Sequence, residues 1–354
     1  MEKFSTYYTV SCHTTNKMIA RFYIQLPFAL TIPENEPYTV YVYKSGPYNI
    51  KFFFPVRGEK ADSYFDADNI KLSGKKAFNA DILRIDFQKK SFNRKKDSED
   101  DPPIDLVETV ANNFLARLRY VTNASRVKLI KLSNLNWSST YLTDNESQLR
   151  NDKRYIRGRG MRKYEFSYIV LNKQIWDNIH SIQPDYALPV WKTLLLDAGS
   201  ILPEIGPAII LTFTALEVFI SKTLDDIVAT KRFDNDFWEW VNNRGFFLKN
   251  PTIEEKYDFL SRHLIGKSIK DNKELWESFK HLQKARNSFA HTGVAMIGNE
   301  IVTEEKARNF IDKANEIIEL LKNELPQKLR WPEFKNEVKL EFSQVIFKPE
   351  EESS

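Results

Sequence analysis

Six consecutive residues, RNSFAH at positions 286–291, bring together three side chains that could do chemistry on a phosphodiester. The imidazole of His291 exchanges a proton near neutral pH, so it can serve as a general acid or base. The guanidinium of Arg286 is a permanent cation that can stabilise charge developing on phosphate oxygens. The amide of Asn287 can orient the imidazole or bind a phosphate oxygen. Because RNA carries its own nucleophile, the ribose 2′-OH, these groups would suffice to cleave RNA without a metal.

A helix must position these side chains, and its pattern places them at the helix end. Helical spacing of apolar residues predicts a helix over 271–292, and its apolar stripe consists of Leu275, Phe279, Leu282 and Phe289. Arg286 lies on that same stripe, so its charge must find a carboxylate, a phosphate or a carbonyl. Asn287 and His291 are four residues apart and lie side by side on another face. Gly293 ends the helix and leaves His291 in the last turn, where the helix dipole favours the cationic imidazole.

The same helix separates the two charged members of the motif. Five residues of a regular helix rotate the side chains of Arg286 and His291 apart by about 140°. The two can share a site only if the last turn distorts or if a second copy of the chain completes the site. The plainer interpretation is an ordinary surface histidine, because this Arg-to-His spacing is expected about once by chance in such a chain. We interpret His281 and His263 as structural or surface residues.

A second candidate site is the segment RNDKRYIRGRGMRK at 150–163, which holds seven basic residues and one acidic residue. Guanidinium groups can follow a phosphate backbone, an aromatic ring can stack on a base, and glycines keep such a loop adaptable. We expect a loop between two strands, and a solvated hairpin loop without function is the alternative. The candidate RNA-binding residues are Arg150, Lys153, Arg154, Tyr155, Arg157, Arg159, Arg162 and Lys163.

The first part of the chain has the pattern of a sheet. β-Branched and aromatic segments, separated by turn residues, predict strands at 17–30, 38–44, 49–56, 80–88, 126–137 and 163–171. Apolar residues at helical spacing predict a helix over 104–118 that packs one face on this sheet.

The sequence after residue 186 has the pattern of helices. They are predicted at 187–202, 205–230, 234–243, 252–265, 271–292 and 303–325. Asp234 can cap the third helix, Thr252 and Glu255 form a capping box for the fourth, and Thr303 opens the last. The segment 331–347 has strand-like alternation that could return it to the N-terminal part, and 348–354 is expected to be disordered.

Composition limits the classes of function. The chain has 354 residues, of which 42% are hydrophobic, enough for two domains with cores. A single cysteine, Cys12, excludes an internal disulfide and a cysteine-based zinc site, and we expect no metal and no cofactor. The longest apolar run, 207–220, is too short for a bilayer and neither end resembles a signal, so we expect a cytoplasmic protein without membrane contact. Up to residue 199 there are 30 basic and 22 acidic residues, which favours a polyanionic partner for this half.

These motifs resemble a known family. RNSFAH matches the pattern of Arg, polar residue, then His in HEPN domains, and FTALEVFISKTLDDI resembles their long early helix with its acidic residue, here Glu217. The resemblance covers about 187–325 and is nearest to the Apea-like HEPN domains of prokaryotic anti-phage proteins, which also carry a β-rich region in front. It implies a helical bundle that dimerises so that two Arg/His motifs face one cleft, and metal-independent endoribonuclease activity. HEPN toxins paired with nucleotidyltransferase antitoxins have a tyrosine shortly after the histidine, whereas this chain has Thr292, Gly293 and Val294, which argues against regulation by tyrosine modification.

We therefore expect an α+β protein with a β-rich recognition or regulatory domain at 1–186, an all-α HEPN-like bundle at 187–328 and a C-terminal extension at 329–354. The expected function is an endoribonuclease that produces 2′,3′-cyclic phosphate and 5′-OH ends, as an anti-phage defence or toxin effector. RNA is the expected substrate, the bundle is expected to form a homodimer, and a phage-derived or nucleotide trigger is expected at the N-terminal domain. The expected site residues are Arg286, Asn287, His291 and Glu217.

The sequence also allows two alternatives. The bundle could be a non-catalytic HEPN-like module that binds nucleic acid or nucleotide, or that dimerises with a partner. Arg286 would then be an ion-pair residue of the core. Glu217, at the edge of the apolar stripe of its helix, could approach Arg286 or could be a plain surface carboxylate.

Overall fold

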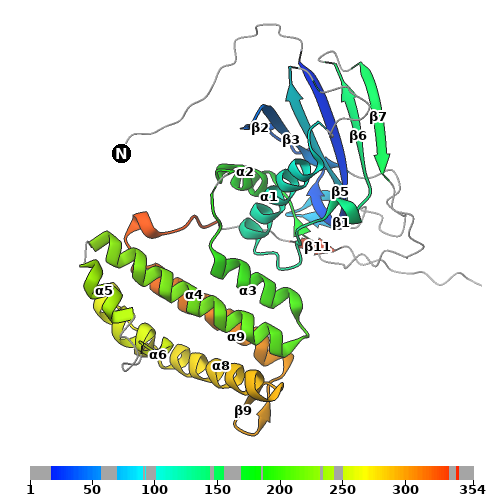
Figure 1. Cartoon of the computed structure of the whole chain (residues 1–354). Helices are drawn as coiled ribbons and strands as arrows, with labels where there is room; N and C mark the ends of the chain where they lie inside the picture. The colour runs from blue at the N-terminus through cyan, green and yellow to red at the C-terminus, as the bar shows by residue number, and fades with distance from the viewer. Residues whose placement is uncertain are drawn as a thin grey trace, which may run out of the picture. The chain divides into compact units, whose positions relative to one another are not determined.

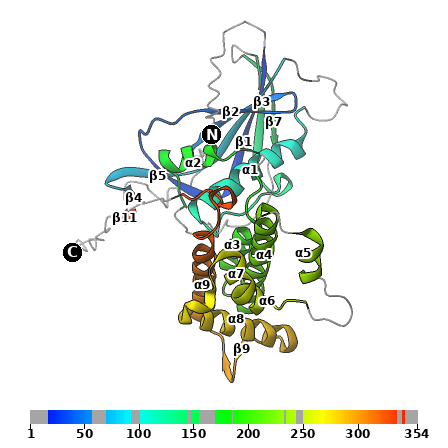
Figure 2. The same ribbon diagram turned by 90° about the vertical axis from the view of Figure 1, so that its left-hand side faces the viewer.

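The computed structural model describes residues 17–56, 70–90, 92, 101–143, 147–154, 169–184, 186–231, 234–242, 250–334 and 340–342. These residues form a β-rich N-terminal region and a helical C-terminal region, which confirms the α+β class (Figures 1 and 2). The chain divides into two compact units. The first comprises 1–118, 127–184 and 336–354, and the second comprises 119–126 and 185–335.

The first unit is built on a sheet whose longest strands are β1 (Met18–Pro33) and β5 (Lys75–Lys89), paired antiparallel. The order of the main path is β11-β4-β5-β1-β6-β7, with β3 also paired to β5, β2 to β3, and β8 to β1. The other described strands are β2 (Tyr41–Ser45), β3 (Tyr48–Val56), β4 (Ile70–Leu72), β6 (Trp137–Leu142), β7 (Gln148–Arg154), β8 (Ile169–Val170) and β11 (Leu340–Phe342). The strands predicted before residue 90 are confirmed.

Two helices, α1 (Ile104–Thr122) and α2 (Lys173–Ser181), pack on this sheet (Figure 1). Phe114 of α1 stacks on Phe52 of β3 with ring centroids 5.3 Å apart. It also contacts Trp176 of α2, whose ring centroid lies 5.6 Å away. All three side chains are buried, and the apolar stripe predicted for 104–118 therefore faces the sheet as expected.

The strand predicted at 126–137 is wrong over most of its length. A short 3-10 turn, Leu132–Asn134, replaces it, and regular pairing starts only at Trp137. The backbone donors of this segment bond to side chains of α1: Ile130 N donates to Asn112 Oδ1 at 2.7 Å, and Leu132 N donates to Glu108 at 2.9 Å. Because α1 already satisfies these groups, no neighbouring strand is needed.

The loop predicted at 150–163 begins later than expected. Its first five residues belong to β7, which pairs antiparallel with β6 from Trp137↔Arg154 to Tyr141↔Arg150. The partner strand β6 offers unpaired backbone groups on its outer side, and these residues extend the sheet there. Residues 155–168 lie outside the described part of the chain.

The second unit is a set of helices, and the six predicted helices are confirmed. They are α3 (Val190–Ile201), α4 (Ile205–Lys231), α5 (Asn235–Asn242), a helix over 253–265 that contains one π turn, α8 (Lys273–Thr292) and α9 (Glu304–Lys322). The helix with the π turn consists of α6 (Ile253–Glu255), η4 (Lys256–Leu260) and α7 (Ser261–Ile265), and a short hairpin, β9 (Met296–Ile297) with β10 (Glu300–Ile301), joins α8 to α9.

The predicted capping residues explain where these helices begin. Asp234 accepts a hydrogen bond from Phe237 N at 2.9 Å. Thr252 and Glu255 form the full capping box, in which each side chain accepts from the backbone of the other residue. Thr303 accepts from Lys306 N and opens α9. Short-range side-chain chemistry therefore sets these helix starts.

The long helix α4 is the central helix of the second unit. By length and composition alone it is apolar enough to cross a membrane, the one such helix in the described residues. The core helix of a bundle meets the same criteria, and α4 buries residues such as Phe213, Leu216 and Phe219 in the cluster it forms with α3, α8 and α9. The buried Tyr257 hydroxyl donates to Leu216 O at 2.8 Å, which ties the neighbouring helix to α4.

Replacing Gly206 by alanine is expected to destabilise the protein by about 1–3 kcal/mol, because the added carbon overpacks the core. That β-carbon would lie 2.0 Å from Cε2 of Phe289 on α8, so the ring or the start of α4 must move. Gly199→Ala in α3 is the matched control: its β-carbon would lie 3.4 Å from Cβ of Ser125, an ordinary contact. Alanine also has the higher helix propensity, so this control should be neutral or stabilising by up to about 1 kcal/mol. Denaturant unfolding measures both variants, and equal effects would contradict the close packing of Phe289 on Gly206.

Candidate functional site

The helix α8 carries the motif and is regular to its end. Asn272 caps its start by accepting from Leu275 N, and its buried residues are Leu275, Phe279, Leu282 and Ala285. Gly293 ends it with a left-handed φ of 75°, and its N–H donates to Phe289 O at 2.9 Å. The helix therefore keeps its α geometry through Thr292, and no distortion of the last turn brings Arg286 and His291 together.

Arg286 is half-buried, and its guanidinium interacts with two of the described residues. Its Nη1 donates to Oδ1 of Asn287 at 3.1 Å. Its Cζ lies 5.5 Å from the ring centroid of Phe213, a buried residue of α4. Within the described part of the chain, no carboxylate lies within ion-pair distance of Arg286. Of the three partners that the sequence allowed, the fold supplies a carbonyl, and the positive charge remains available for an anion.

In the structure the third member of the motif is not bonded to the first two. Asn287 is exposed, and its amide oxygen accepts from Arg286 rather than from the imidazole of His291. His291 is exposed in the last turn of α8 and forms no hydrogen bond or ion pair with any described residue. Within one chain, therefore, Arg286 and Asn287 form a hydrogen-bonded pair, and His291, one turn after Asn287, is not bonded to either of them.

Glu217 lies on α4, one turn after Phe213, and is half-buried. It lines a shallow, open depression of about 560 Å³ on one face of α4, together with Thr214, Val218, Ser221, Lys222 and Asp225. Burial raises the pKa of the Tyr257 hydroxyl above its ordinary value, and the negative charge of Glu217 raises it further. No described residue forms an ion pair with Glu217, Arg286 included. Glu217 is thus a neighbour of Phe213, on which Arg286 lies, without being bonded to the guanidinium.

Short polar contacts fix the chain just after the motif. Ser288 Oγ donates to Val294 O at 2.9 Å, and Thr292 Oγ1 donates to Ser288 O at 2.8 Å. Val302 N donates to Ala295 O at 2.9 Å, which closes the β9–β10 hairpin beside the helix end. His291 therefore projects from a helix end that is held by several hydrogen bonds.

Two supporting residues were missed by the sequence argument. In the sequence Phe213 is one of several apolar residues of its helix, and no local signal shows that an arginine covers its ring. Gly206 does carry a signal, because a glycine inside a helix costs helix stability and usually marks a close approach. Here the approaching group is Phe289, which lies between Arg286 and His291 in α8.

The basic segment belongs to the first unit, whereas RNSFAH belongs to the second. Arg150, Lys153 and Arg154 lie on β7, opposite Tyr141, Ser138 and Trp137 of β6 respectively. The remaining candidates, Tyr155, Arg157, Arg159, Arg162 and Lys163, lie outside the described residues.

The other two histidines of the second unit, His263 and His281, are not part of the RNSFAH motif. His263 is exposed, and its Nδ1 lies 2.8 Å from Phe259 O in the same helix. His281 is half-buried on α8, ten residues before His291. Among the described residues, no group of three or more His, Cys, Asp or Glu side chains is arranged to hold a metal ion.

Comparisons with known proteins give no family for the chain. No protein-family model, no curated protein and no solved structure matches it.

Proposed function

We propose that the second unit is a HEPN-like bundle that cleaves RNA without a metal, in the cytoplasm, as an anti-phage defence or toxin effector. One observation carries the proposal. Arg286 is a half-buried guanidinium, fixed by Asn287 and the Phe213 ring and neutralised by no described carboxylate, and an exposed histidine follows it at the helix end. A fixed cation without a bonded carboxylate, followed by an imidazole that can accept and donate a proton, is suited to a phosphodiester.

The chemistry needs only these groups and the RNA itself. The 2′-oxygen attacks the adjacent phosphorus, the bond from phosphorus to the 5′-oxygen breaks, and a 2′,3′-cyclic phosphate forms. His291 accepts the proton of the 2′-OH, and the 5′-oxygen leaves with a proton from the imidazolium or from water. Arg286 stabilises the extra negative charge on the phosphorane oxygens, and Asn287 holds the guanidinium in place.

A second copy of the chain completes this site. Because α8 is regular, Arg286 and His291 of one chain diverge by about 140° and cannot both face one phosphate. A homodimer through the bundle would place His291 of one copy beside Arg286 of the other. The chain near His291 exposes Val294 and Ile301, with 42% and 67% of their surface accessible, which gives a second copy apolar surface to cover. The first unit would then recognise a phage-derived or nucleotide trigger and hold back RNA cleavage by the second unit until the trigger binds.

The chemistry of the product ends tests the activity. Purified full-length protein, incubated with a defined RNA in the presence of a chelator, is expected to give 5′-OH ends that polynucleotide kinase labels without prior phosphatase treatment. The 3′ ends should carry a cyclic phosphate, and an RNA with a 2′-deoxy sugar at the cleaved position should resist cleavage. That substituted RNA is the matched control, since it keeps the phosphate and loses only the nucleophile. Products with 5′-phosphate ends, or equal cleavage of the substituted RNA, would exclude this mechanism.

One observation favours a second candidate, a non-catalytic module that binds nucleic acid or nucleotide. His291 forms no hydrogen bond with Arg286 or Asn287 in one chain, and a surface that only binds RNA needs no such bond. On this alternative the protein binds RNA with a strong dependence on salt and leaves the RNA intact. The core ion pair that this alternative would assign to Arg286 is not formed with any described residue.

A further inference from the structure

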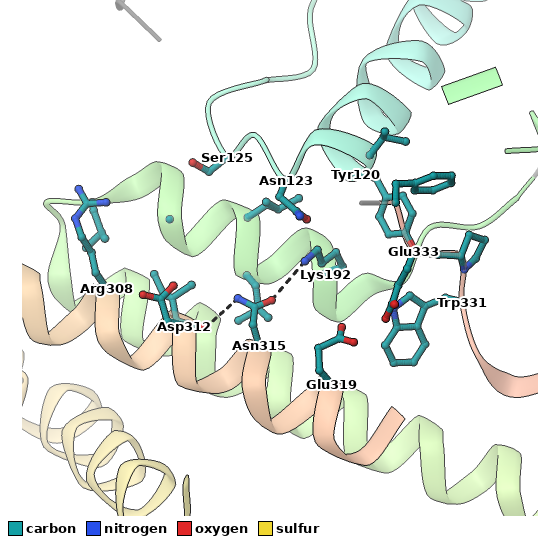
Figure 3. Close-up of a pocket in the computed structure, with 18 residues that line it drawn as sticks. Tyr120, Asn123, Ser125, Lys192, Arg308, Asp312, Asn315, Glu319, Trp331 and Glu333 are labelled. Carbon is teal, nitrogen blue, oxygen red and sulfur yellow. Dashed lines mark hydrogen bonds between the residues drawn. The ribbon is translucent and has the colours of Figure 1, made fainter. Parts of the chain in front are cut away.

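The second unit contains a pocket that has no part in the RNSFAH site. Its volume is about 600 Å³, within the range of pockets that hold small molecules. It is formed by α3, α9 and the segments 119–126 and 331–334, all within this unit (Figure 3). None of the four candidate site residues lines it.

One face of α9 forms the polar side of the pocket. Arg308, Asp312, Asn315 and Glu319 follow one another at intervals of four, three and four residues, so they project from the same face of the helix. Figure 3 shows Arg308 and Asp312 toward one end, Asn315 in the middle and Glu319 beyond it. The opposite face of α9 is apolar and buried in the bundle, so the polar face can line the pocket.

The second helix of the pocket contributes one cation on an otherwise apolar surface. Lys192 of α3 reaches toward Asn315, and its Nζ donates to Oδ1 at 3.4 Å, a long hydrogen bond (Figure 3). Leu195 and Leu196 of the same helix line the adjoining surface. Lys192 is half-buried, and burial lowers the pKa of its ammonium while the nearby Glu319 partly opposes this.

Most of the other charges in the pocket are already paired. Glu319 lies 3.5 Å from the ammonium of Lys322, and Glu333 pairs with the same ammonium. Arg308 pairs with Glu304 at 2.6 Å.

Two charges in the pocket are left over. Lys192 and Asp312 form no ion pair with any described residue. A half-buried ammonium with a single long hydrogen bond has lost hydration, and Glu319 acts on it only through its charge, without an ion pair at contact distance. Asp312 is exposed at the edge of the pocket, and its carboxylate can accept hydrogen bonds from a donor.

We propose that this pocket binds a small metabolite with an oxyanion group, a carboxylate or a phosphate, on Lys192 and a hydroxyl or amino group on Asp312. The ammonium has donors to spare for the oxyanion, and Asn315 stands next to it to fix its position. The carboxylate of Asp312 selects for a donor at the other end of the ligand. The apolar surface of α3 contacts the carbon skeleton between these two groups.

Calorimetry and thermal shift on the full-length protein test this proposal. One arm uses inorganic phosphate and ribose 5-phosphate as probes, and the other uses serine and glutamate, so that the two sources of the oxyanion are distinguished. At least one arm is expected to bind and to raise the melting temperature. Lys192→Met keeps the length of the side chain and removes its charge, and it should weaken that binding by about 10- to 100-fold, as expected for a charge-assisted hydrogen bond.

Two further variants keep the outcome unambiguous. Lys328→Met removes an exposed lysine outside the pocket and should leave the affinity unchanged. Asp312→Asn changes an exposed residue, so it should fold as the wild type does, and it should weaken a probe with a donor group while sparing inorganic phosphate. The proposal is overturned if no probe binds at millimolar concentration, or if Lys192→Met and Lys328→Met bind the probe equally well.

Discussion

The variant His291→Ala is expected to cleave RNA about 10²- to 10⁴-fold more slowly than the wild type, the usual contribution of a general acid or base. The imidazole is exposed and bonded to no described residue, so its loss should change the free energy of unfolding by less than about 0.5 kcal/mol. A loss of rate without a loss of stability is the signature of a residue that acts on the substrate. Single-turnover rates on one RNA and denaturant unfolding of the same samples measure the two quantities.

Two other histidines of the same unit provide the controls for this experiment. His281→Ala removes an imidazole from the same helix, and His263→Ala removes one whose Nδ1 lies 2.8 Å from a backbone carbonyl oxygen. Both should retain cleavage within a few-fold of the wild type. If His291→Ala cleaves as fast as these two variants, the histidine is a surface residue and the catalytic proposal fails.

An equal mixture of Arg286→Ala and His291→Ala, each inactive alone, is expected to recover about a quarter of wild-type activity, by the arithmetic of a two-fold dimer. After subunits exchange, about half of the dimers hold one copy of each variant. In such a dimer one site combines the intact Arg286 of one copy with the intact His291 of the other, and the second site has lost both. The recovery would follow from the regular α8 helix, which prevents one chain from supplying both groups to one phosphate.

The mixing experiment needs evidence that subunits exchange. Tagging the two variants differently and isolating the doubly tagged species provides it, and mixing either variant with the Arg286→Ala/His291→Ala double variant is the negative control. Exchange without any recovery would show that Arg286 and His291 do not work across two copies. Recovery in the control with the double variant would point to a contaminating ribonuclease.

The sequence predicted the helices of the second unit well, because their signals are local. Thr252 and Glu255 stand three residues apart and form the capping box by themselves. The end of α8 at Gly293 likewise depends on one residue with a left-handed backbone. Elements of this kind need no knowledge of distant parts of the chain.

The predictions that failed or fell short depended on distant partners. Residues 126–137 have strand-like composition, but Asn112 and Glu108 of α1 satisfy their backbone donors from 18 and 24 residues away. The pattern of α8 showed that Arg286 needed a partner and could not show that Phe213 would lie beneath it. In the same way the spacing of polar residues in α9 can be read from the sequence, whereas the hydrogen bond between Lys192 and Asn315 of α9 depends on how α3 packs against α9.

The last described strand, β11, follows the second unit in the sequence but belongs to the first unit. There β11 pairs antiparallel with β4, from Leu340↔Leu72 to Phe342↔Ile70, and β4 pairs on its other side with β5. A chain shortened after residue 334 would keep every helix of the second unit and would leave one side of β4 without its partner. An uncovered strand edge can pair with a strand of another molecule. Such a truncation would therefore remove the β4–β11 hydrogen bonds and make the protein more prone to aggregate.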